Sequence, residues 1–193
     1  MVIVFASCKK TEQSQNPSQT TTTTETTTFK ELDSTLNPAE IKNTIVGTWI
    51  CDETISPQSF YGDYYNKKIT KSNVRMCTTY KFNKDGSYST SVTIINISDV
   101  RKEYRSLMVE GARRNVEKEG KYLTTDDVLY YEKYADDILK NICKTTKGTY
   151  KIDGNKLLYG DGTTETFAIN GKQLAINGST KETGEYKIVL TRT

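Results

Sequence analysis

The chain contains no histidine, and this absence removes most of the hydrolytic chemistry that a small protein could carry. None of its 193 residues is a histidine, so Ser-His and Cys-His nucleophile pairs and the HExxH zinc motif are excluded. The usual general base near neutral pH is missing for the same reason. We therefore expect no enzymatic activity, no cofactor and no metal site.

Long apolar runs and clustered positive charge are also lacking. No segment approaches the roughly 18 consecutive apolar residues of a membrane-spanning helix, so a membrane contact would require a lipid. Lys and Arg number 27 against 24 Asp and Glu, which gives a formal net charge of +3, and the two signs are interspersed along the chain. Without a basic stripe, nucleic acid is not an expected partner.

The first ten residues hold a short apolar run, residues 2–5, followed by Ala6-Ser7-Cys8 and two lysines. This order resembles the lipobox of bacterial lipoproteins, which implies a truncated signal over residues 1–8 and a lipid on Cys8. The apolar run is shorter than the roughly 7 to 15 residues of a signal peptide, and no basic residue precedes it. We interpret this as a start codon assigned too far downstream. The alternative is a cytosolic chain with a chance cysteine.

The lipobox resemblance implies a location as well as a modification. It predicts a protein anchored in the bacterial cell envelope by its lipid, on the outer membrane if the lysine after Cys8 is read by the enterobacterial sorting rule. Residues 9–43 are rich in Thr, Ser, Gln and Asn and offer almost no apolar surface. Such a composition is typical of a disordered tether, whose span as a flexible coil would be about 30 to 35 Å.

Residues 44–193 are long enough for one domain with its own core, and turn signals divide them into short strands. Asp85-Gly86, Asp153-Gly154 and Asn170-Gly171 separate segments that alternate in polarity with period two, which is the pattern of β-hairpins. The sequence predicts a mainly β domain of about eight strands over residues 46–53, 78–82, 87–94, 148–152, 156–159, 165–169, 173–176 and 185–193.

Residues 99–143, between the third and fourth predicted strands, break the β pattern. Their apolar residues recur at a helical period, so we predict an insertion of two helices, with Ser98 as the N-cap of the first and Thr124 or Thr125 as the N-cap of the second. Two acidic pairs, 126–127 and 136–137, could suggest metal binding. Neighbouring side chains on a helix diverge by about 100 degrees, so we interpret the pairs as a cap and a solvated face.

The first strand begins with Gly47-Thr48-Trp49 and the last ends with Arg192. Together with the hairpin series, these residues resemble the lipocalin and calycin group, and the order of elements resembles the lipocalin-like domains of Bacteroidetes-type lipoproteins. The resemblance implies a small antiparallel barrel over most of residues 44–193, closed at one end by a pair of Trp49 and Arg192. It also implies a cation-π contact in that pair. The helical insertion is larger than a typical lipocalin connection and could cover the barrel mouth, fill it, or form a separate face.

The resemblance also implies a barrel interior that could hold a ligand. Residues that lie in phase with apolar strand neighbours are the candidates for the interior and for binding a small apolar or aromatic molecule: Trp49, Tyr80, Phe82, Tyr150, Phe167 and Tyr186. The 13 tyrosines of the chain could instead form a binding surface, but interior side chains fill most small barrels. We favour a core role for most of them.

The cysteines that remain if Cys8 carries a lipid are Cys51, Cys77 and Cys143, and an odd number allows at most one disulfide among them. Cys77 and Cys143 flank the hairpin of residues 78–94 and the insertion, and the resembling lipoprotein domains often have cysteines at these places, so we predict a Cys77–Cys143 bridge. Cys51 shares strand parity with Trp49 and is expected to face inward as a buried thiol. A catalytic Cys51 is disfavoured because no histidine is present to activate it.

Two functions remain open from the sequence. The first is an anchored lipocalin-like domain that binds an unidentified small apolar or aromatic ligand, which requires a cavity. The alternative is a surface lipoprotein with a closed core that acts by protein-protein contact through the helical insertion. The alternative requires an exposed apolar patch on that insertion.

Overall fold

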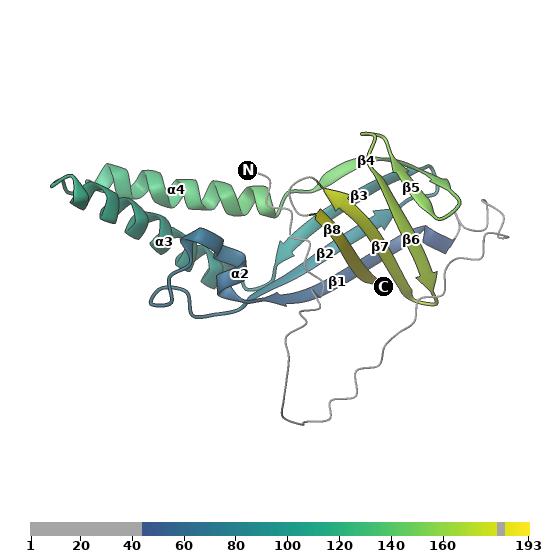
Figure 1. Ribbon diagram of the computed structural model, residues 1–193, viewed down its shortest axis with the longest axis horizontal. Coiled ribbons are helices and arrows are strands. Elements are labelled where there is room, and N and C mark those ends of the chain that lie inside the picture. Colours follow the sequence, from purple (N-terminus) through teal and green to yellow (C-terminus); the bar gives the residue numbers. More distant parts are fainter. Residues whose placement is uncertain (1–43, 181–183) are drawn as a thin grey trace, which may run out of the picture. The chain divides into compact units, whose positions relative to one another are not determined.

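Strands form a closed barrel in which each strand neighbours the next along the chain and β8 returns to β1 (Figure 1). The computed structural model describes residues 44–180 and 184–193, so the predicted signal at 1–8, Cys8 and the predicted tether at 9–43 lie outside the described residues. The order of elements is β1 (Gly47–Ile55), α2 (Pro57–Tyr61), the short 3-10 helix η1 (Gly62–Tyr64), β2 (Val74–Phe82), β3 (Ser87–Ile94), α3 (Ile97–Lys118), α4 (Thr125–Ile142), β4 (Thr146–Asp153), β5 (Lys156–Tyr159), β6 (Thr164–Asn170), β7 (Gln173–Thr180) and β8 (Gly184–Arg192).

The predicted fold class is confirmed. The barrel is antiparallel, it has eight strands, and the two long helices α3 and α4 lie between β3 and β4 in the chain. The chain divides into two compact units. The barrel unit contains the described residues up to Cys51 together with 80–89 and 147–193, and the helical unit contains 52–79 and 90–146. Because β1, β2 and β3 continue from one unit into the other, they supply residues to both.

Tight turns set the register of the barrel hairpins. Asn170 pairs with Gln173 across the β6–β7 turn, and Asp153 pairs with Lys156 across the β4–β5 turn. Each connection therefore has two residues, and its first is a glycine with a φ of 56°. Two-residue hairpins require such positive φ angles, and glycine adopts them without steric cost. The hairpins predicted from these glycines are confirmed.

In the helical unit, the second long helix begins where a capping box fixes it. The Thr124 hydroxyl accepts a hydrogen bond from the Asp127 amide at 3.2 Å, and the Asp127 carboxylate accepts one from the Thr124 amide at 3.0 Å. These reciprocal bonds satisfy backbone donors that the helix leaves open. The Thr124 hydroxyl also donates to the Asp127 carboxylate at 2.6 Å, and this bond, followed by the bond from the Thr124 amide, lowers the pKa of Asp127. Of the two expected caps, Thr124 is the one used.

The prediction that Ser98 caps α3 is wrong. The helix begins at Ile97, so Ser98 lies inside its first turn and the N-cap position falls on Asn96. The Asn96 side chain makes no cap hydrogen bond. It accepts instead from the Arg75 amide at 3.0 Å and donates to the Asn73 carbonyl at 2.9 Å. The Asn96 side chain therefore makes tertiary hydrogen bonds instead of capping the helix.

The segment between β1 and β2 contains a short helix that the sequence analysis did not predict. Ser56 caps α2 by accepting from the Ser59 amide at 3.2 Å, and Pro57 follows in the first turn, where its missing N–H costs nothing. Glu103 of α3 holds this segment in place, because its carboxylate accepts from the Tyr61 hydroxyl and the Lys71 amide, both at 3.0 Å. This Ser-Pro signal was present in the sequence and could have marked the helix.

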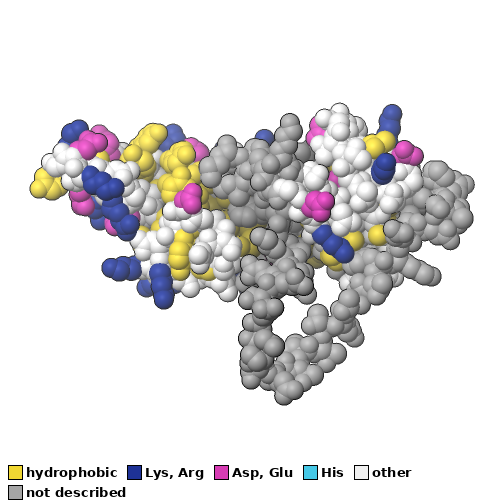
Figure 2. Space-filling view, viewed as in Figure 1, with side chains coloured by type: hydrophobic (Ala, Val, Ile, Leu, Met, Phe, Trp, Pro, Cys, Tyr) yellow, Lys and Arg dark blue, Asp and Glu magenta, His cyan; other side chains and the backbone are white. Residues whose placement is uncertain are grey.

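Helices α3 and α4 bury one face each, as their periodicity predicted. The buried residues of the two helices include Val100, Tyr104, Leu107, Met108, Ala112, Ala135 and Leu139. The helical unit also leaves large apolar side chains at its surface (Figure 2). Tyr122 is 91% exposed and Tyr130 is 64% exposed, and Leu129 and Tyr134 are also exposed. No helix among residues 44–180 and 184–193 is long and apolar enough to cross a membrane.

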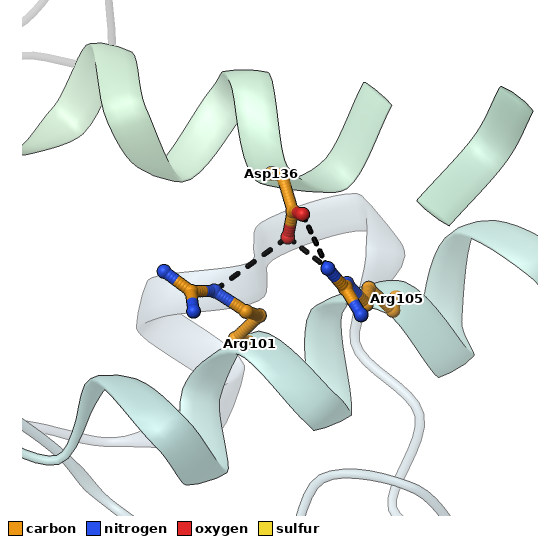
Figure 3. Close-up of polar contacts among 3 residues, drawn as sticks. All are labelled: Arg101, Arg105 and Asp136. Carbon is orange, nitrogen blue, oxygen red and sulfur yellow. Dashed lines mark hydrogen bonds and ion pairs between the residues drawn. The ribbon is translucent and has the colours of Figure 1, made fainter. Parts of the chain in front are cut away.

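The interpretation of Asp136 as part of a solvated face needs correction. Its carboxylate accepts two hydrogen bonds from the Arg105 guanidinium, one of them at 3.0 Å, and lies 3.6 Å from Nε of Arg101 (Figure 3). The hydrogen bonds from Arg105 lower the pKa of this carboxyl more than any other cause. Asp136 therefore joins α4 to α3. The adjacent Asp137 is exposed.

The predicted Cys77–Cys143 disulfide is not formed. Among the described residues no cysteine is joined to another, and Cys77 and Cys143 are separate thiols. Cys77 hydrogen-bonds with the side chains of Asp52 and Thr79, and burial is the main reason that its pKa is raised. Cys143 serves as the C-cap residue of α4, with its amide bonded to the Leu139 carbonyl at 3.0 Å. Each cysteine has local partners of its own, so their positions on either side of the insertion did not predict a disulfide.

Candidate functional site

Trp49 and Arg192 lie together where β1 pairs with β8. The two residues are directly paired in the β1–β8 register, and the Arg192 guanidinium carbon lies 4.5 Å from the centre of the Trp49 ring. The Trp49 side chain is 0% exposed and donates from Nε1 to the Ile45 carbonyl at 2.8 Å. Arg192 also donates to the Thr44 carbonyl. The bond to Ile45 satisfies the polar atom of Trp49, and the cation-π contact expected for this pair is present.

The interior next to this pair is filled with apolar side chains. Phe82 and Phe167 are almost fully buried, and Tyr150 packs edge-on against Phe82 with ring centres 5.1 Å apart. The Tyr150 hydroxyl donates to the Asn83 carbonyl at 3.0 Å. Of the residues proposed for a ligand site, Trp49, Phe82, Tyr150 and Phe167 thus belong to the packed core. Tyr80 is partly buried and lies against this core. Tyr186 is partly buried as well.

Glu165 is a buried carboxylate inside the barrel unit, and the sequence analysis did not select it. The residue is 7% exposed. Its Oε2 accepts from the Tyr159 hydroxyl at 2.6 Å, and its Oε1 accepts from the Tyr186 hydroxyl. Glu165 lies on β6 and Tyr159 on the neighbouring β5, while Tyr186 comes from β8, which β7 separates from β6. We call these three residues the carboxylate-tyrosine cluster.

The barrel register places this cluster at the end opposite Trp49. Glu165 is near the start of β6, and Tyr186 is near the start of β8, where it pairs with Gly178 near the end of β7. Trp49 pairs with Arg192 at the other end of β8. The glycine is needed for this arrangement, because a Cβ on Gly178 would lie 2.6 Å from Cζ of Tyr186. The Tyr186 ring therefore occupies the side-chain space at Gly178 and brings its hydroxyl to Glu165.

Further aromatic rings surround the cluster. Tyr88 lies against Tyr159, with ring centres 4.9 Å apart, and Tyr80 stacks on Phe82 at 6.2 Å. The close approach of Tyr88 to β4 also uses a glycine, since a Cβ on Gly148 would lie 2.7 Å from Cε1 of Tyr88. The result is a single glutamate among the rings of Tyr80, Tyr88, Tyr159 and Tyr186.

Burial and the glutamate charge both hold these tyrosines in the neutral form. Burial is the largest cause of the raised pKa of Tyr159, followed by the charge of Glu165 and the hydrogen bond to it. The same causes raise the pKa of Tyr186, and burial followed by the Glu165 charge raises that of Tyr80. Neutral tyrosine hydroxyls are hydrogen-bond donors. The cluster is therefore an acceptor carboxylate held by neutral donors.

Glu165 has no cationic partner in the part of the chain that the structure describes. The ion pairs at Asp136, Glu110 and Glu119 belong to the helical unit. A buried carboxylate without a countercharge loses the solvation it has in water. Each of its oxygens can accept about two hydrogen bonds, and Tyr159 and Tyr186 supply one to each. The Glu165 carboxylate can therefore accept further hydrogen bonds, and no positive charge of the described residues balances its negative charge.

The side-chain groups of the cluster define what it could bind. Among residues 44–180 and 184–193, no group of three His, Cys, Asp or Glu side chains could hold a metal ion. The site offers one carboxylate, several hydroxyls and aromatic faces. Such a set matches the few placed polar groups and aromatic lining that are typical of small-molecule sites.

A signal for Glu165 was present in the sequence. Residues 165–169 alternate with period two, and Glu165 shares the parity of Phe167 and Ile169, so it had to point inward with them. An acidic residue on the inward face of a predicted strand is rare enough to be a site candidate. Tyr159 had no comparable signal, because its contact with Glu165 depends on the pairing of β5 with β6.

Comparison with known proteins gave no match: no protein-family model, no curated protein and no solved structure is detectably similar to this chain. The functional argument therefore depends on the geometry of the chain itself.

Proposed function

We propose that the barrel unit binds a small organic molecule at the carboxylate-tyrosine cluster, without chemical conversion. The observation that carries the proposal is the 7% exposed Glu165, held by Tyr159 and Tyr186. An apolar residue of similar size at this position would avoid the cost of burying a charge. A retained carboxylate with spare acceptor capacity is better explained by a ligand that uses it.

The aromatic rings support a ligand with an aromatic or apolar part. The rings of Tyr80 and Tyr88 lie beside the cluster, and Tyr159 contributes a ring within it. Planar rings in such a site can stack on aromatic ligands. Trp49, Phe82 and Phe167 contribute from the core behind the site, where they stabilise the barrel.

Native mass spectrometry of the full chain tests this proposal. We expect an organic adduct that is released on denaturation, or that is taken up from a metabolite extract. A Glu165→Met variant should lose the adduct, while a Glu185→Met variant, which removes an exposed charge from β8, should retain it. A bare mass after exposure to the extract, or equal uptake by both variants, would contradict the proposal.

We also propose that the domain is exported and held at the bacterial outer membrane by a lipid on Cys8. The lipobox-like order around Cys8 and the polar composition of residues 9–43 support this. In a bacterial host, the chain expressed with a complete lipoprotein signal peptide before Cys8 should be labelled by an alkyne-labelled fatty acid and should lie in the membrane fraction. Cys8→Ala should abolish both the labelling and the recovery of the chain in the membrane fraction, whereas Cys51→Ala should change neither. Absence of label from the unchanged chain would overturn the proposed anchor.

A second candidate function is protein-protein contact through the helical unit. The exposed Tyr122, Leu129, Tyr130 and Tyr134 favour it, because aromatic side chains are enriched in interfaces. A photo-crosslinking residue placed at Tyr130 in cells should then give one adduct of defined mass. The same residue at the exposed Lys140 of α4 is the control. Equal or absent adducts at the two positions would count against this function.

A further inference from the structure

The barrel contains a negative charge that the chain itself does not neutralise. In the described residues, the hydrogen-bond partners of Glu165 are the hydroxyls of Tyr159 and Tyr186, and its charge also acts on Tyr80 and Tyr88. An ionised carboxylate held only by neutral donors remains one positive charge short of neutrality. A ligand that carries one positive charge would neutralise the Glu165 carboxylate.

We propose that the cluster binds an organic ammonium ion, with the ammonium group on the Glu165 carboxylate and the apolar body against the tyrosine rings. This inference rests on the proposed binding function and specifies its ligand class. Glu165 keeps acceptor capacity for N–H donors, and a charge-assisted hydrogen bond is roughly twice as strong as a neutral one. The faces of tyrosine rings also attract cations, most strongly where water is excluded.

The same charge selects against other ligands. A fatty acid or another carboxylate would bring a second negative charge beside Glu165, and Asp161 adds to the negative field at Tyr88. Like charges at close range in a partly buried site repel strongly. A neutral alcohol could replace one N–H contact but would leave the Glu165 charge uncompensated. The order of affinity should therefore be cation, then neutral molecule, then anion.

Three probes of similar shape and different charge test this order with the full chain. They are 2-phenylethylamine, 2-phenylethanol and 3-phenylpropanoate, and their affinities can be measured by isothermal titration calorimetry. We expect the amine to bind with one site per chain, at least about tenfold tighter than the alcohol, and the carboxylate to bind more weakly than the alcohol. This comparison uses the unchanged protein, so it does not depend on the folding of any variant.

Matched variants then locate the effect. Glu165→Gln keeps the size and hydrogen-bonding groups of the side chain and removes its charge, so it should lower the amine affinity at least about tenfold and leave that of the alcohol within about twofold. Glu185→Gln removes the same charge from the exposed side chain next to Tyr186 and should leave amine binding unchanged. Thermal unfolding of both variants checks that the barrel is intact.

The outcomes separate this inference from the broader proposal. If the amine and the alcohol bind equally, or if Glu165→Gln binds the amine as tightly as the unchanged chain, the ammonium ligand is wrong while the binding function stands. If the amine does not bind at all, the inference also fails, and the adduct seen or not seen by native mass spectrometry decides the binding function independently.

Discussion

The two units treat a carboxylate in opposite ways. In the helical unit, Asp136 lies in a partly exposed position, with its side chain 34% exposed, and is neutralised by Arg105 and Arg101. In the barrel unit, Glu165 is 7% exposed and is held by the hydroxyls of Tyr159 and Tyr186. Asp136 has the partners that a structural ion pair needs, whereas Glu165 has donors but no positive charge.

This difference separates a residue that joins two helices from one that is suited to a ligand. An exposed ion pair contributes little to stability but needs nothing else for neutrality. A buried carboxylate among neutral groups lowers the stability of the fold. A role in ligand binding would explain why it is present. If this difference holds, the barrel core should be sensitive to substitution and the surface of the helical unit should tolerate it.

The largest expected effect comes from the barrel core. Trp49→Ala should lower the free energy of unfolding by about 3 to 5 kcal/mol, because it leaves a cavity among fully buried side chains and removes the ring under Arg192. Tyr130→Ala, at an exposed position of α4, should change it by less than about 0.5 kcal/mol. Urea unfolding followed by circular dichroism measures both. Similar losses would show that the helical surface is as constrained as the barrel core.

Alkaline pH should destabilise the protein through the cluster. An unfolded tyrosine ionises near pH 10, while burial and Glu165 raise the pKa of Tyr159 in the folded state. The folded chain thus keeps a proton that the unfolded chain has released. Its contribution to stability is complete below about pH 10 and declines at higher pH, by up to about 1.4 kcal/mol per pH unit.

Urea unfolding over a series of pH values measures this decline. Tyr159→Phe should flatten the dependence of unfolding free energy on pH, and Tyr130→Phe in α4 should not. Tyr104 of the helical unit, whose pKa burial raises to about 12, adds a decline of its own that both variants retain. An unchanged slope in Tyr159→Phe would show that the hydroxyl of Tyr159 is not held as the structure places it.

The same substitution in the two units should have opposite signs. Gly178→Ala should lower the free energy of unfolding by about 1 to 3 kcal/mol, since its new methyl group meets the Tyr186 ring and must displace it. Gly111→Ala, in the middle of α3 with open space around its Cβ, should raise it by about 0.5 to 1 kcal/mol. Thermal and urea unfolding check both. Stabilisation by Gly178→Ala would contradict the placement of Tyr186 over Gly178.

The smallest effect is expected at the two carboxylates themselves. Asp136→Asn should cost about 0.2 to 1 kcal/mol, and less at high salt. Its depressed folded pKa, due mainly to Arg105, means that the contribution is present above about pH 4 and is lost as the pH falls further.

Glu165→Gln should not lower the free energy of unfolding, because it removes a buried charge and keeps groups that can hydrogen-bond with Tyr159 and Tyr186. The measurement is urea unfolding at neutral pH beside Asp136→Asn. If Glu165→Gln lowers the free energy of unfolding more than Asp136→Asn does, Glu165 stabilises the barrel and its burial does not indicate a ligand.

The sequence predicted the barrel well because its signals are local. Asn170-Gly171 and Asp153-Gly154 require turns whatever surrounds them, and Thr124 with Asp127 caps a helix within four residues. It failed where a distant partner competes with a local preference. Asn96 is held by Asn73 and Arg75 and displaces the helix start from Ser98, and Asp136 finds Arg105 on the other helix.

The candidate site was predicted only in part, and for the same reason. Tyr80 and Tyr186 were selected by their strand parity, which also applied to Glu165, but parity says only that a side chain points inward. It does not say which inward side chains meet.

Local interactions over a few residues therefore decided the strands, the turns, the two long helices and the inward direction of Glu165. Closure of the barrel decided the site. Only the pairing of β5 with β6, of β6 with β7 and of β7 with β8 brings the hydroxyls of Tyr159 and Tyr186 to one carboxylate, with Gly178 leaving room for the second ring. The energy of a buried charge depends on everything packed around it, and that surrounding exists only in the folded protein.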